Sequence, residues 1–128
     1  MTSEKTRILI IDDDEVHLET TKGILEEEGY EVHVQNRPLG STNRIRDLQP
    51  HLVLLDVNMP GLSGTTLSTI IRSNPATMKV PLYLYSSNDE DLLRKAVKEN
   101  NLSGYVCKGS PSELRAKVAR AVASRSYS

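Results

Sequence analysis

The chain has 128 residues, of which 38% are hydrophobic and 26% charged, so we expect one folded domain over residues 1–128 and not a disordered segment. Its 16 Lys and Arg nearly balance its 17 Asp and Glu, which excludes the basic field of a nucleic-acid-binding domain. No apolar run approaches the roughly 20 residues of a membrane helix, the N-terminus lacks the layout of a secretory signal, and the single cysteine, Cys107, suits a reducing cytoplasm.

Five short apolar runs along the chain predict strands. The first, third and fourth are almost continuous in Ile, Val, Leu and Tyr, as expected of strands that are covered on both faces. The second alternates apolar and polar residues, which favours a place near an edge of the sheet. The five runs are Arg7–Ile11, Tyr30–Val34, Leu52–Leu55, Val80–Tyr85 and Gly104–Cys107.

Segments with helical spacing follow the strands. The second helix, around Leu39 to Leu48, is the least regular, because its apolar spacing is loose and Gly40 lowers helix propensity. Pro75 is expected to end the third helix. On the other predicted helices one face is formed by Leu18, Thr21 and Leu25; by Leu67, Ile70 and Ile71; less regularly by Leu92, Ala96 and Glu99; and by Leu114, Val118, Ala121 and Val122.

Strand and helix therefore alternate five times. This alternation predicts an α/β fold, in which a parallel sheet has right-handed crossovers and carries helices on both faces. In such a sheet the chemistry gathers at the carboxyl ends of the strands. Every predicted strand except the second ends there in polar groups: Asp12, Asp13 and Asp14; Asp56 and Asn58; Ser86, Ser87 and Asn88; and Lys108.

These groups suit phosphoryl chemistry with a divalent cation. Asp12, Asp13 and Asp56 would repel one another if they met, and a hard cation such as Mg²⁺, which prefers oxygen ligands, would relieve that repulsion. Lys108 would add a fixed positive charge, and the Ser86 hydroxyl can donate to a phosphoryl oxygen. An aspartate can act as the nucleophile and form an acyl phosphate.

The combination resembles the receiver domain of response regulators in two-component signalling, and the resemblance covers essentially the whole chain. It is carried by the run from Ile8 to Asp13, by the run from Leu52 to Gly61 with its Asn58-Met59-Pro60-Gly61 end, by Gly64, and by Ser86 and Lys108 in the same order. The resemblance implies a single flavodoxin-like (βα)5 fold, a doubly wound five-stranded sheet with strand order 2-1-3-4-5.

The resemblance also implies a role for each residue of the site. Asp56 would be the phosphoacceptor, and Lys108 and Ser86 would assist it. Mg²⁺, with Mn²⁺ as a substitute, would be bound by Asp13, Asp56 and the backbone carbonyl of Asn58, with Asp12 acting mostly through water. Ser86 and Tyr105 would form the switch, and Asn58 and Asn88 would tune the lifetime of the acyl phosphate.

The partners implied by the resemblance are proteins. A sensor histidine kinase or a histidine phosphotransfer protein would supply the phosphoryl group, and a downstream protein or output domain would receive the signal. The surface that changes would be that of the fourth helix, fifth strand and fifth helix, through which the domain could also dimerise. No direct contact with nucleic acid or membrane is expected. The domain would be a signalling module and not an enzyme.

One residue departs from the family pattern. Gly109 stands where the family usually has a proline joined to the lysine by a cis bond. Because a cis bond before a residue other than proline costs about 2.5–4 kcal/mol, we predict a trans Lys108–Gly109 bond and a reshaped loop. Tyr83 and Tyr85 are bulkier than the aliphatic residues expected in the fourth strand, and at least one of them should reach the surface with its hydroxyl.

Ordinary structural roles account for several other polar residues. Asp14 is expected to cap the first helix, Ser87 the fourth and Ser110 the fifth. Cys107 is expected to be a small buried core residue. His17, His33 and His51 are scattered, so we expect surface positions and no histidine metal site.

Two other classes of function remain open at this level. A haloacid-dehalogenase-type phosphatase also uses an aspartate nucleophile, but it needs a second acid two residues later, where this chain has Asn58, and usually a cap insertion. A degenerate receiver would dock a partner without phosphorylation, and only Gly109 favours it. A flavodoxin-like cofactor binder, which shares the predicted fold, is disfavoured. Its phosphate-binding loop would be rich in Ser, Thr and Gly where this chain has three aspartates.

Overall fold

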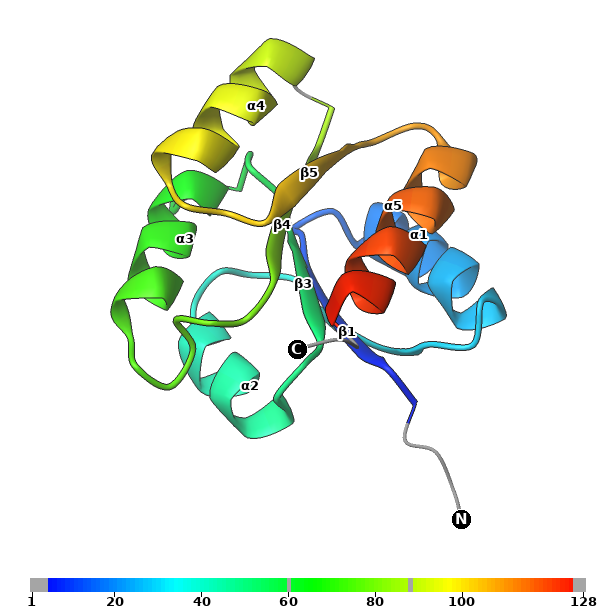
Figure 1. The fold of residues 1–128 in the computed structure, drawn as a ribbon, viewed down its shortest axis with the longest axis horizontal. Coiled ribbons are helices and arrows are strands. Elements are labelled where there is room, and N and C mark those ends of the chain that lie inside the picture. Colours follow the sequence, from blue (N-terminus) through cyan, green and yellow to red (C-terminus); the bar gives the residue numbers. More distant parts are fainter. Residues whose placement is uncertain (1–4, 60, 88, 126–128) are drawn as a thin grey trace.

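The computed structural model describes residues 5–59, 61–87 and 89–125. One sheet of five parallel strands forms its centre, in the order β2-β1-β3-β4-β5 (Figure 1). This arrangement confirms the predicted flavodoxin-like fold. In register, Ile8 of β1 lies opposite Val32 of β2 and Leu52 of β3. The strands are β1 (Arg7–Ile11), β2 (Glu31–Gln35), β3 (Leu52–Leu55), β4 (Leu82–Ser86) and β5 (Gly104–Cys107).

The helices form a layer on each face of the sheet. Figure 1 shows α1 and α5 together on one side, and α2, α3 and α4 on the other. This is the result of right-handed crossovers from a sheet that grows in both directions from β1. The helices are α1 (Glu15–Glu27), α2 (Ser41–Leu48), α3 (Gly64–Ser73), α4 (Glu90–Glu99) and α5 (Pro111–Arg125).

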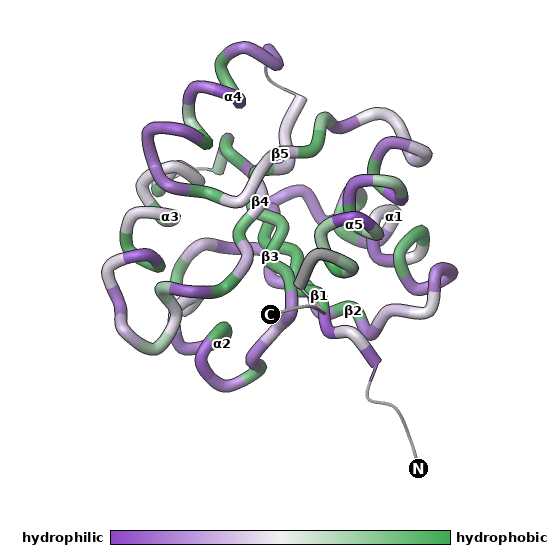
Figure 2. The backbone as a smooth tube through the Cα atoms, in the orientation of Figure 1, coloured by the Kyte–Doolittle hydropathy of each residue, from purple (hydrophilic) through white to green (hydrophobic). Residues whose placement is uncertain are grey.

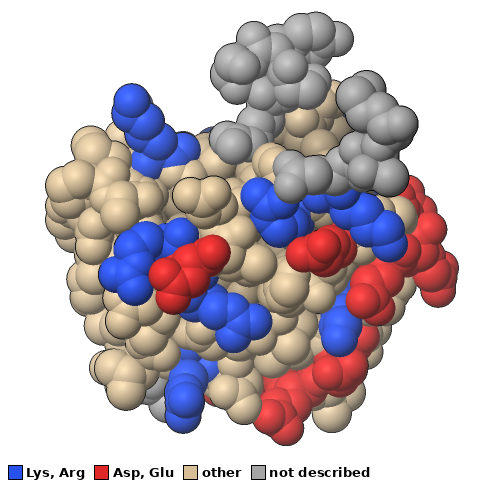
Figure 3. All heavy atoms as spheres, turned by 90° about the horizontal axis from the view of Figure 1, so that it is seen from below, with Lys and Arg blue, Asp and Glu red and all other residues tan. Residues whose placement is uncertain are grey.

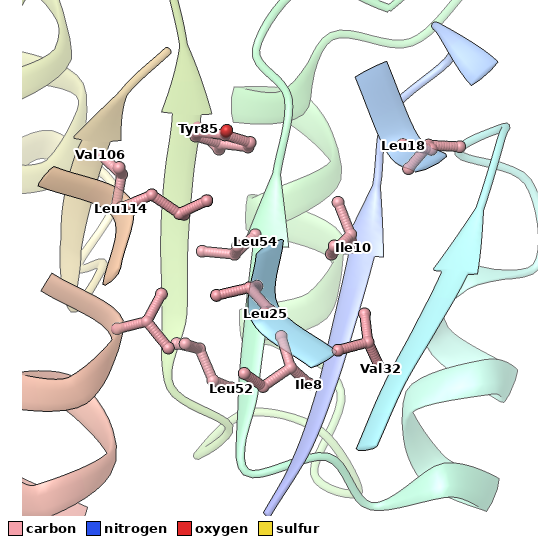
Figure 4. Close-up of a cluster of buried hydrophobic side chains, with 11 residues drawn as sticks. Ile8, Ile10, Leu18, Leu25, Val32, Leu52, Leu54, Tyr85, Val106 and Leu114 are labelled. Atoms are coloured by element: carbon pink, nitrogen blue, oxygen red, sulfur yellow. The ribbon is translucent and has the colours of Figure 1, made fainter. Parts of the chain in front are cut away.

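Two apolar cores hold these layers together, one on each face. Because side chains alternate along a strand, Ile8 and Ile10 of β1 face α1 and α5, while Leu9 and Ile11 face α2 and α3. All four are fully buried. The hydropathy colouring of Figure 2 shows the same layout, with apolar segments concentrated in the central strands. Figure 4 shows the core beneath α1 and α5, where side chains from all five strands meet those of the two helices.

Two predicted helix faces are partly wrong. On α3, Leu67 and Ile71 are buried as expected, but Ile70 is 44% exposed. On α4, Leu92 is 60% exposed, and its neighbour Leu93 packs into the core instead. The reason is that each helix buries only a narrow face. Leu93 is the buried residue of α4, so the neighbouring position, which is turned by about 100° around the helix axis, points to solvent.

The ends of the elements agree with the predictions in most places. Three of the predicted strands have the observed bounds, while β2 and β4 begin one and two residues later than predicted. Asp14 caps α1 by accepting a hydrogen bond from the His17 N–H, and Ser110 accepts one from the Glu113 N–H at 3.2 Å. The predicted cap of α4 was wrong. The side chain of Asp89, and not that of Ser87, accepts a hydrogen bond from the Asp91 N–H in the first turn of this helix. Asp89 immediately precedes the first helical residue, and Ser87 stands too far upstream.

The tyrosines of β4 have different surroundings. Tyr83 is half-buried and its ring packs against Gly104 of β5, where a Cβ atom would lie 2.7 Å from the ring. Tyr85 is buried, and its hydroxyl lies 3.3 Å from that of Thr21 on α1. Tyr83 is thus the more exposed of the two tyrosines, and the expectation that one of them reaches the surface with its hydroxyl stays a prediction. Cys107, in contrast, is half-buried and not part of the core, because it lies at the end of the edge strand β5.

The charges of the chain are mixed on the surface. On the face drawn in Figure 3, Lys and Arg side chains alternate with Asp and Glu, so no continuous field of one sign covers it. Within the described parts of the chain, no helix is long and apolar enough to cross a bilayer.

We expect buried side chains in the central strands of the sheet to contribute most to the free energy of unfolding. Leu54 of β3 is fully buried between strands and helices, so Leu54→Ala is expected to lower the free energy of unfolding by about 2–5 kcal/mol. Val16→Ala is the matched control, because Val16 is 79% exposed, and it should change stability by less than about 0.5 kcal/mol. Urea unfolding of both variants measures this. Equal losses would contradict the placement of the core.

Candidate functional site

Three carboxylates meet where β1 and β3 end. Asp12 and Asp56 directly follow these neighbouring strands, and the Asp56 N–H donates to the carbonyl of Ile11 at 2.9 Å. One carboxylate oxygen from each of Asp12, Asp13 and Asp56 lies within 4.8 Å of the others. Asp12 and Asp56 are buried, and Asp13 is exposed. The predicted acidic cluster therefore exists, and it could bind a metal ion from the solvent side.

Lys108 reaches this cluster from the end of β5. Its Nζ lies 2.8 Å from Asp12 Oδ2 and 3.6 Å from Asp56 Oδ1. Its backbone N–H donates to the carbonyl of Ser86 at 2.9 Å, which continues the pairing of β5 with β4. The ammonium is therefore held between the two buried acids.

The replacement at Gly109 does not move Lys108 out of the site. The described residues contain no cis peptide bond, so the predicted trans Lys108–Gly109 bond is confirmed. Gly109 has a φ of 101°, in the left-handed region that is strained for residues with a Cβ atom. Glycine is what lets the chain turn into α5 here while the lysine side chain still points at the carboxylates.

Asp12 has two further partners. Its Oδ1 accepts a hydrogen bond from the Asp14 N–H at 3.0 Å, and its Oδ2 lies 3.0 Å from His17 Nδ1. His17, expected at the surface, has a side chain that is 24% exposed, and the sequence did not indicate its contact with Asp12. For the other two, His33 pairs with exposed Glu31, and His51 accepts from the Arg7 N–H at 2.9 Å.

Burial and partners shift the pKa values of the two buried acids in opposite directions. Burial is the largest influence on Asp56 and raises its pKa. The ammonium of Lys108 lowers this pKa, and the neighbouring charge of Asp12 raises it by less, so the pKa stays above its usual value. For Asp12, burial also opposes ionisation, but the hydrogen bonds from Lys108, Asp14 and His17 together lower its pKa below the usual value. Burial lowers the pKa of Lys108, yet the two carboxylates raise it overall, so the lysine stays charged.

Ser86 and Asn58 lie beside Asp56. Ser86 is fully buried at the end of β4, and Asn58 Nδ2 donates to its hydroxyl at 3.5 Å. The Asn58 N–H donates to Asp56 Oδ1 at 3.3 Å. Two predicted features, Pro60 and the tuning residue Asn88, lie outside the described residues.

Tyr105 is directed away from the carboxylates, towards the start of α4. Its hydroxyl donates to Glu90 Oε1 at 3.0 Å. The Nζ of Lys117 lies 4.0 Å from the ring centroid and donates to the Tyr105 carbonyl at 2.9 Å. The ring is thus held outward by groups from α4 and α5. It is the one predicted site residue, among those described, that lies apart from the acidic cluster.

Gly64 fixes the position of α3 against Asp56. As the first residue of α3 it is buried, and a Cβ atom there would overlap the backbone carbonyl of Asp56. Its N–H donates to the Val57 carbonyl at 2.9 Å. The glycine therefore allows the helix to approach the backbone of the acidic residue directly.

Comparison with known proteins agrees with this geometry. The family model of the response regulator receiver domain matches residues 8–119. The chain is 29% identical over 119 residues to the DNA-binding response regulator MtrA of Mycolicibacterium smegmatis, which covers 92% of this chain and 51% of that protein.

Two solved structures are similar in fold and sequence. A putative response regulator from Chloroflexus aurantiacus has a TM-score of 0.86 and 27% identity, over 94% of this chain and 99% of that one. The BeF3-activated N-terminal receiver domain of Klebsiella pneumoniae RstA has a TM-score of 0.81 and 26% identity, over 91% and 97% of the two chains.

The chain belongs to the response regulator receiver family. It is accordingly a phosphoacceptor signalling module rather than a catalytic enzyme, with the acidic pocket of Asp12, Asp13 and Asp56 facing Lys108. The chain spans about half the length of the curated relatives it matches first.

The close approach of α3 to the Asp56 backbone at Gly64 yields a prediction. Gly64→Ala must push α3 away from the Asp56 backbone, and we expect it to lower the free energy of unfolding by about 1–3 kcal/mol. Gly23→Ala is the matched control, because Gly23 lies within α1 with open space around it and should gain about 0.5–1 kcal/mol. Thermal or urea unfolding measures both. A neutral or stabilising Gly64→Ala would contradict the contact.

The raised pKa of Asp56, which is due mainly to burial, yields another prediction. Because the folded-state pKa of Asp56 is raised, its ionisation destabilises the fold as pH rises through that pKa. In the absence of divalent cations at neutral pH, Asp56→Asn should therefore be more stable than the wild type, by about 1 kcal/mol.

This gain should shrink as pH falls below the pKa of Asp56, because the wild-type carboxyl is then also neutral. Asp47→Asn, at a carboxylate exposed on α2, should not reproduce it. Urea unfolding at several pH values in EDTA tests the prediction. An Asp56→Asn variant less stable than the wild type throughout would contradict it.

Proposed function

We propose that this domain accepts a phosphoryl group on Asp56 from a phosphohistidine of a sensor kinase or phosphotransfer protein, in a reaction that depends on Mg²⁺. The observation that carries the proposal is the difference between the two buried acids. Asp12 accepts hydrogen bonds from Asp14, His17 and Lys108. Among the described residues, Asp56 by contrast accepts a long hydrogen bond from the Asn58 N–H at 3.3 Å and lies 3.6 Å from Lys108. Its carboxylate thus keeps electron pairs available for a nucleophilic attack.

The residues present suit Mg²⁺, with Mn²⁺ as a substitute. Asp13 and Asp56 would bind the ion directly together with the backbone carbonyl of Asn58, and Asp12, whose oxygens are already engaged, would act through water. The bound ion would neutralise charge on the phosphoryl oxygens. The closeness of three carboxylates supports this assignment, since they repel one another and a bound cation would relieve that repulsion further than Lys108 does alone.

The transfer itself balances in a simple way. An oxygen of the Asp56 carboxylate attacks phosphorus, the bond between phosphorus and the partner's imidazole nitrogen breaks, and that nitrogen keeps the electron pair and takes up a proton. Lys108 is placed to bind a phosphoryl oxygen, because it lies 3.6 Å from Asp56 Oδ1. The product is an acyl phosphate on Asp56.

The added charge of about −1.5 to −2 would then draw in the Ser86 hydroxyl and the Lys108 ammonium. Movement of Ser86 would open space into which Tyr105 turns, once its contacts to Glu90 and Lys117 break. The surface of α4, β5 and α5 would change as a result. Asn58, which contacts both Asp56 and Ser86, would tune the lifetime of the acyl phosphate, together with Asn88.

The output partner is proposed from the same surface. A downstream protein, or an output domain of the same protein, would bind to α4, β5 and α5, and dimerisation through this surface is a further form of output. One relative is named as a DNA-binding response regulator. The near-balanced charge of the present domain favours protein contact and no direct binding of nucleic acid by residues 1–128 themselves, which we take as one receiver domain acting in the cytoplasm.

Acetyl phosphate and Mg²⁺ test the proposed acceptor. Intact-mass spectrometry should show one phosphoryl adduct on the wild type, none on Asp56→Asn, and a normal adduct on Asp47→Asn, whose exposed carboxylate lies on α2. EDTA should abolish the adduct. The absence of an adduct on the wild type, or an equal one on Asp56→Asn, would overturn the proposal and favour a docking module that works without phosphorylation.

A further inference from the structure

We propose that His17 is a positioning residue of this site, whose Nδ1–H holds the buried carboxylate of Asp12 so that Lys108 can leave Asp12 and bind the phosphoryl group on Asp56. The inference rests on the proposed function and adds to it a residue from α1. It explains how one lysine can serve two buried acids in turn.

The two donors share one oxygen atom. Asp12 Oδ2 lies 2.8 Å from Lys108 Nζ and 3.0 Å from His17 Nδ1. An ionised carboxylate can only accept hydrogen bonds, so Nδ1 of His17 carries the proton. The Asp12 side chain is 1% exposed, so water from the bulk solvent cannot readily replace a donor lost from Oδ2.

The proposed switch removes one of these donors. When a phosphoryl group is attached to Asp56, Lys108 needs to move only from Asp12 Oδ2 towards Asp56 Oδ1, from which it is already 3.6 Å away. That movement would leave Asp12 as a buried anion with a missing partner, which is costly. The His17 N–H remains on Asp12 Oδ2, so the cost of releasing Lys108 is lower.

His17 is itself held firmly enough to do this. Its backbone N–H donates to the Asp14 side chain at the start of α1. Its ring packs on that of Tyr85 with a centroid distance of 5.1 Å, and the Tyr85 hydroxyl is in turn 3.3 Å from that of Thr21. The imidazole therefore stands in a fixed orientation on a buried tyrosine of β4.

Two substitutions separate the hydrogen bond from the packing. His17→Phe keeps a ring against Tyr85 and removes the N–H. The ring has room, because His17 lines a hollow of about 400 Å³ with Tyr85, Lys108 and Gly109. His17→Asn removes the ring and restores an N–H donor near the place of Nδ1. His33→Phe is the matched control, because His33 lies on β2 and its ring pairs with the exposed carboxylate of Glu31.

The measurement is the affinity for beryllium trifluoride, a stable mimic of the phosphoryl group, at saturating Mg²⁺ by titration calorimetry. We expect His17→Phe to bind it about tenfold more weakly than the wild type, His17→Asn to bind it nearly as well, and His33→Phe to be unchanged. The affinity for Mg²⁺ alone should change much less in His17→Phe, since Lys108 stays on Asp12 in that state. A general loss of structure would instead weaken the affinity for beryllium trifluoride and the affinity for Mg²⁺ alike.

Different outcomes would contradict the role of His17 and the proposed phosphoryl transfer to Asp56. Wild-type affinity in His17→Phe, or an affinity in His17→Asn as weak as in His17→Phe, would overturn the role of His17 and leave the proposed function standing. If the wild type bound beryllium trifluoride no better than Asp56→Asn does, the proposed function would fail and this inference with it.

Discussion

The ammonium of Lys108 lies between two buried carboxylates that repel each other, and the rest of the site depends on this arrangement. The strand order puts β1 beside β3, so Asp12 and Asp56 must end side by side. Lys108 favours Asp12, at 2.8 Å, over Asp56, at 3.6 Å. This preference makes the two acids chemically different: Asp12 becomes a fully bonded anion, and Asp56 keeps a raised pKa and free electron pairs.

The fold keeps these groups in place by packing on both faces of the sheet. β3 and all of β1 after Arg7 are buried, so the loops after these strands start from rigid points. Two glycines adjust the loops. Gly64 lets α3 rest on the Asp56 backbone, and Gly109 turns the chain after Lys108 with a positive φ. Because Gly109 does this with a trans bond, the lysine reaches the acids without the proline that usually follows it in this family.

Much of this could be predicted from the sequence because the signals were local. Short apolar runs predicted the observed bounds of β1, β3 and β5, and the polar groups that follow the strands predicted the acidic cluster. The resemblance to receivers supplied the strand order, which periodicity alone cannot determine. The predicted lysine contact also holds, although the loop at Gly109 differs from the family pattern.

The misses arose where tertiary packing decides between neighbours. Leu92 and Leu93 have the same hydrophobicity, and only the angle at which α4 meets the sheet buries the second. His17 stands five residues after Asp12, across a strand end and a helix cap, a spacing that corresponds to no regular repeat. Its contact with Asp12 depends on the packing of its ring against Tyr85, whose burial the sequence did not reveal.

The central claim is that Asp56, and neither of its acidic neighbours, becomes the acyl phosphate. Borohydride reduces an acyl phosphate of aspartate to homoserine, so peptide mass spectrometry of the phosphorylated and reduced chain locates the modified residue. The account predicts homoserine at position 56 alone, formed only when Mg²⁺ is present. Homoserine at position 12 or 13, or at none of the three, would contradict it.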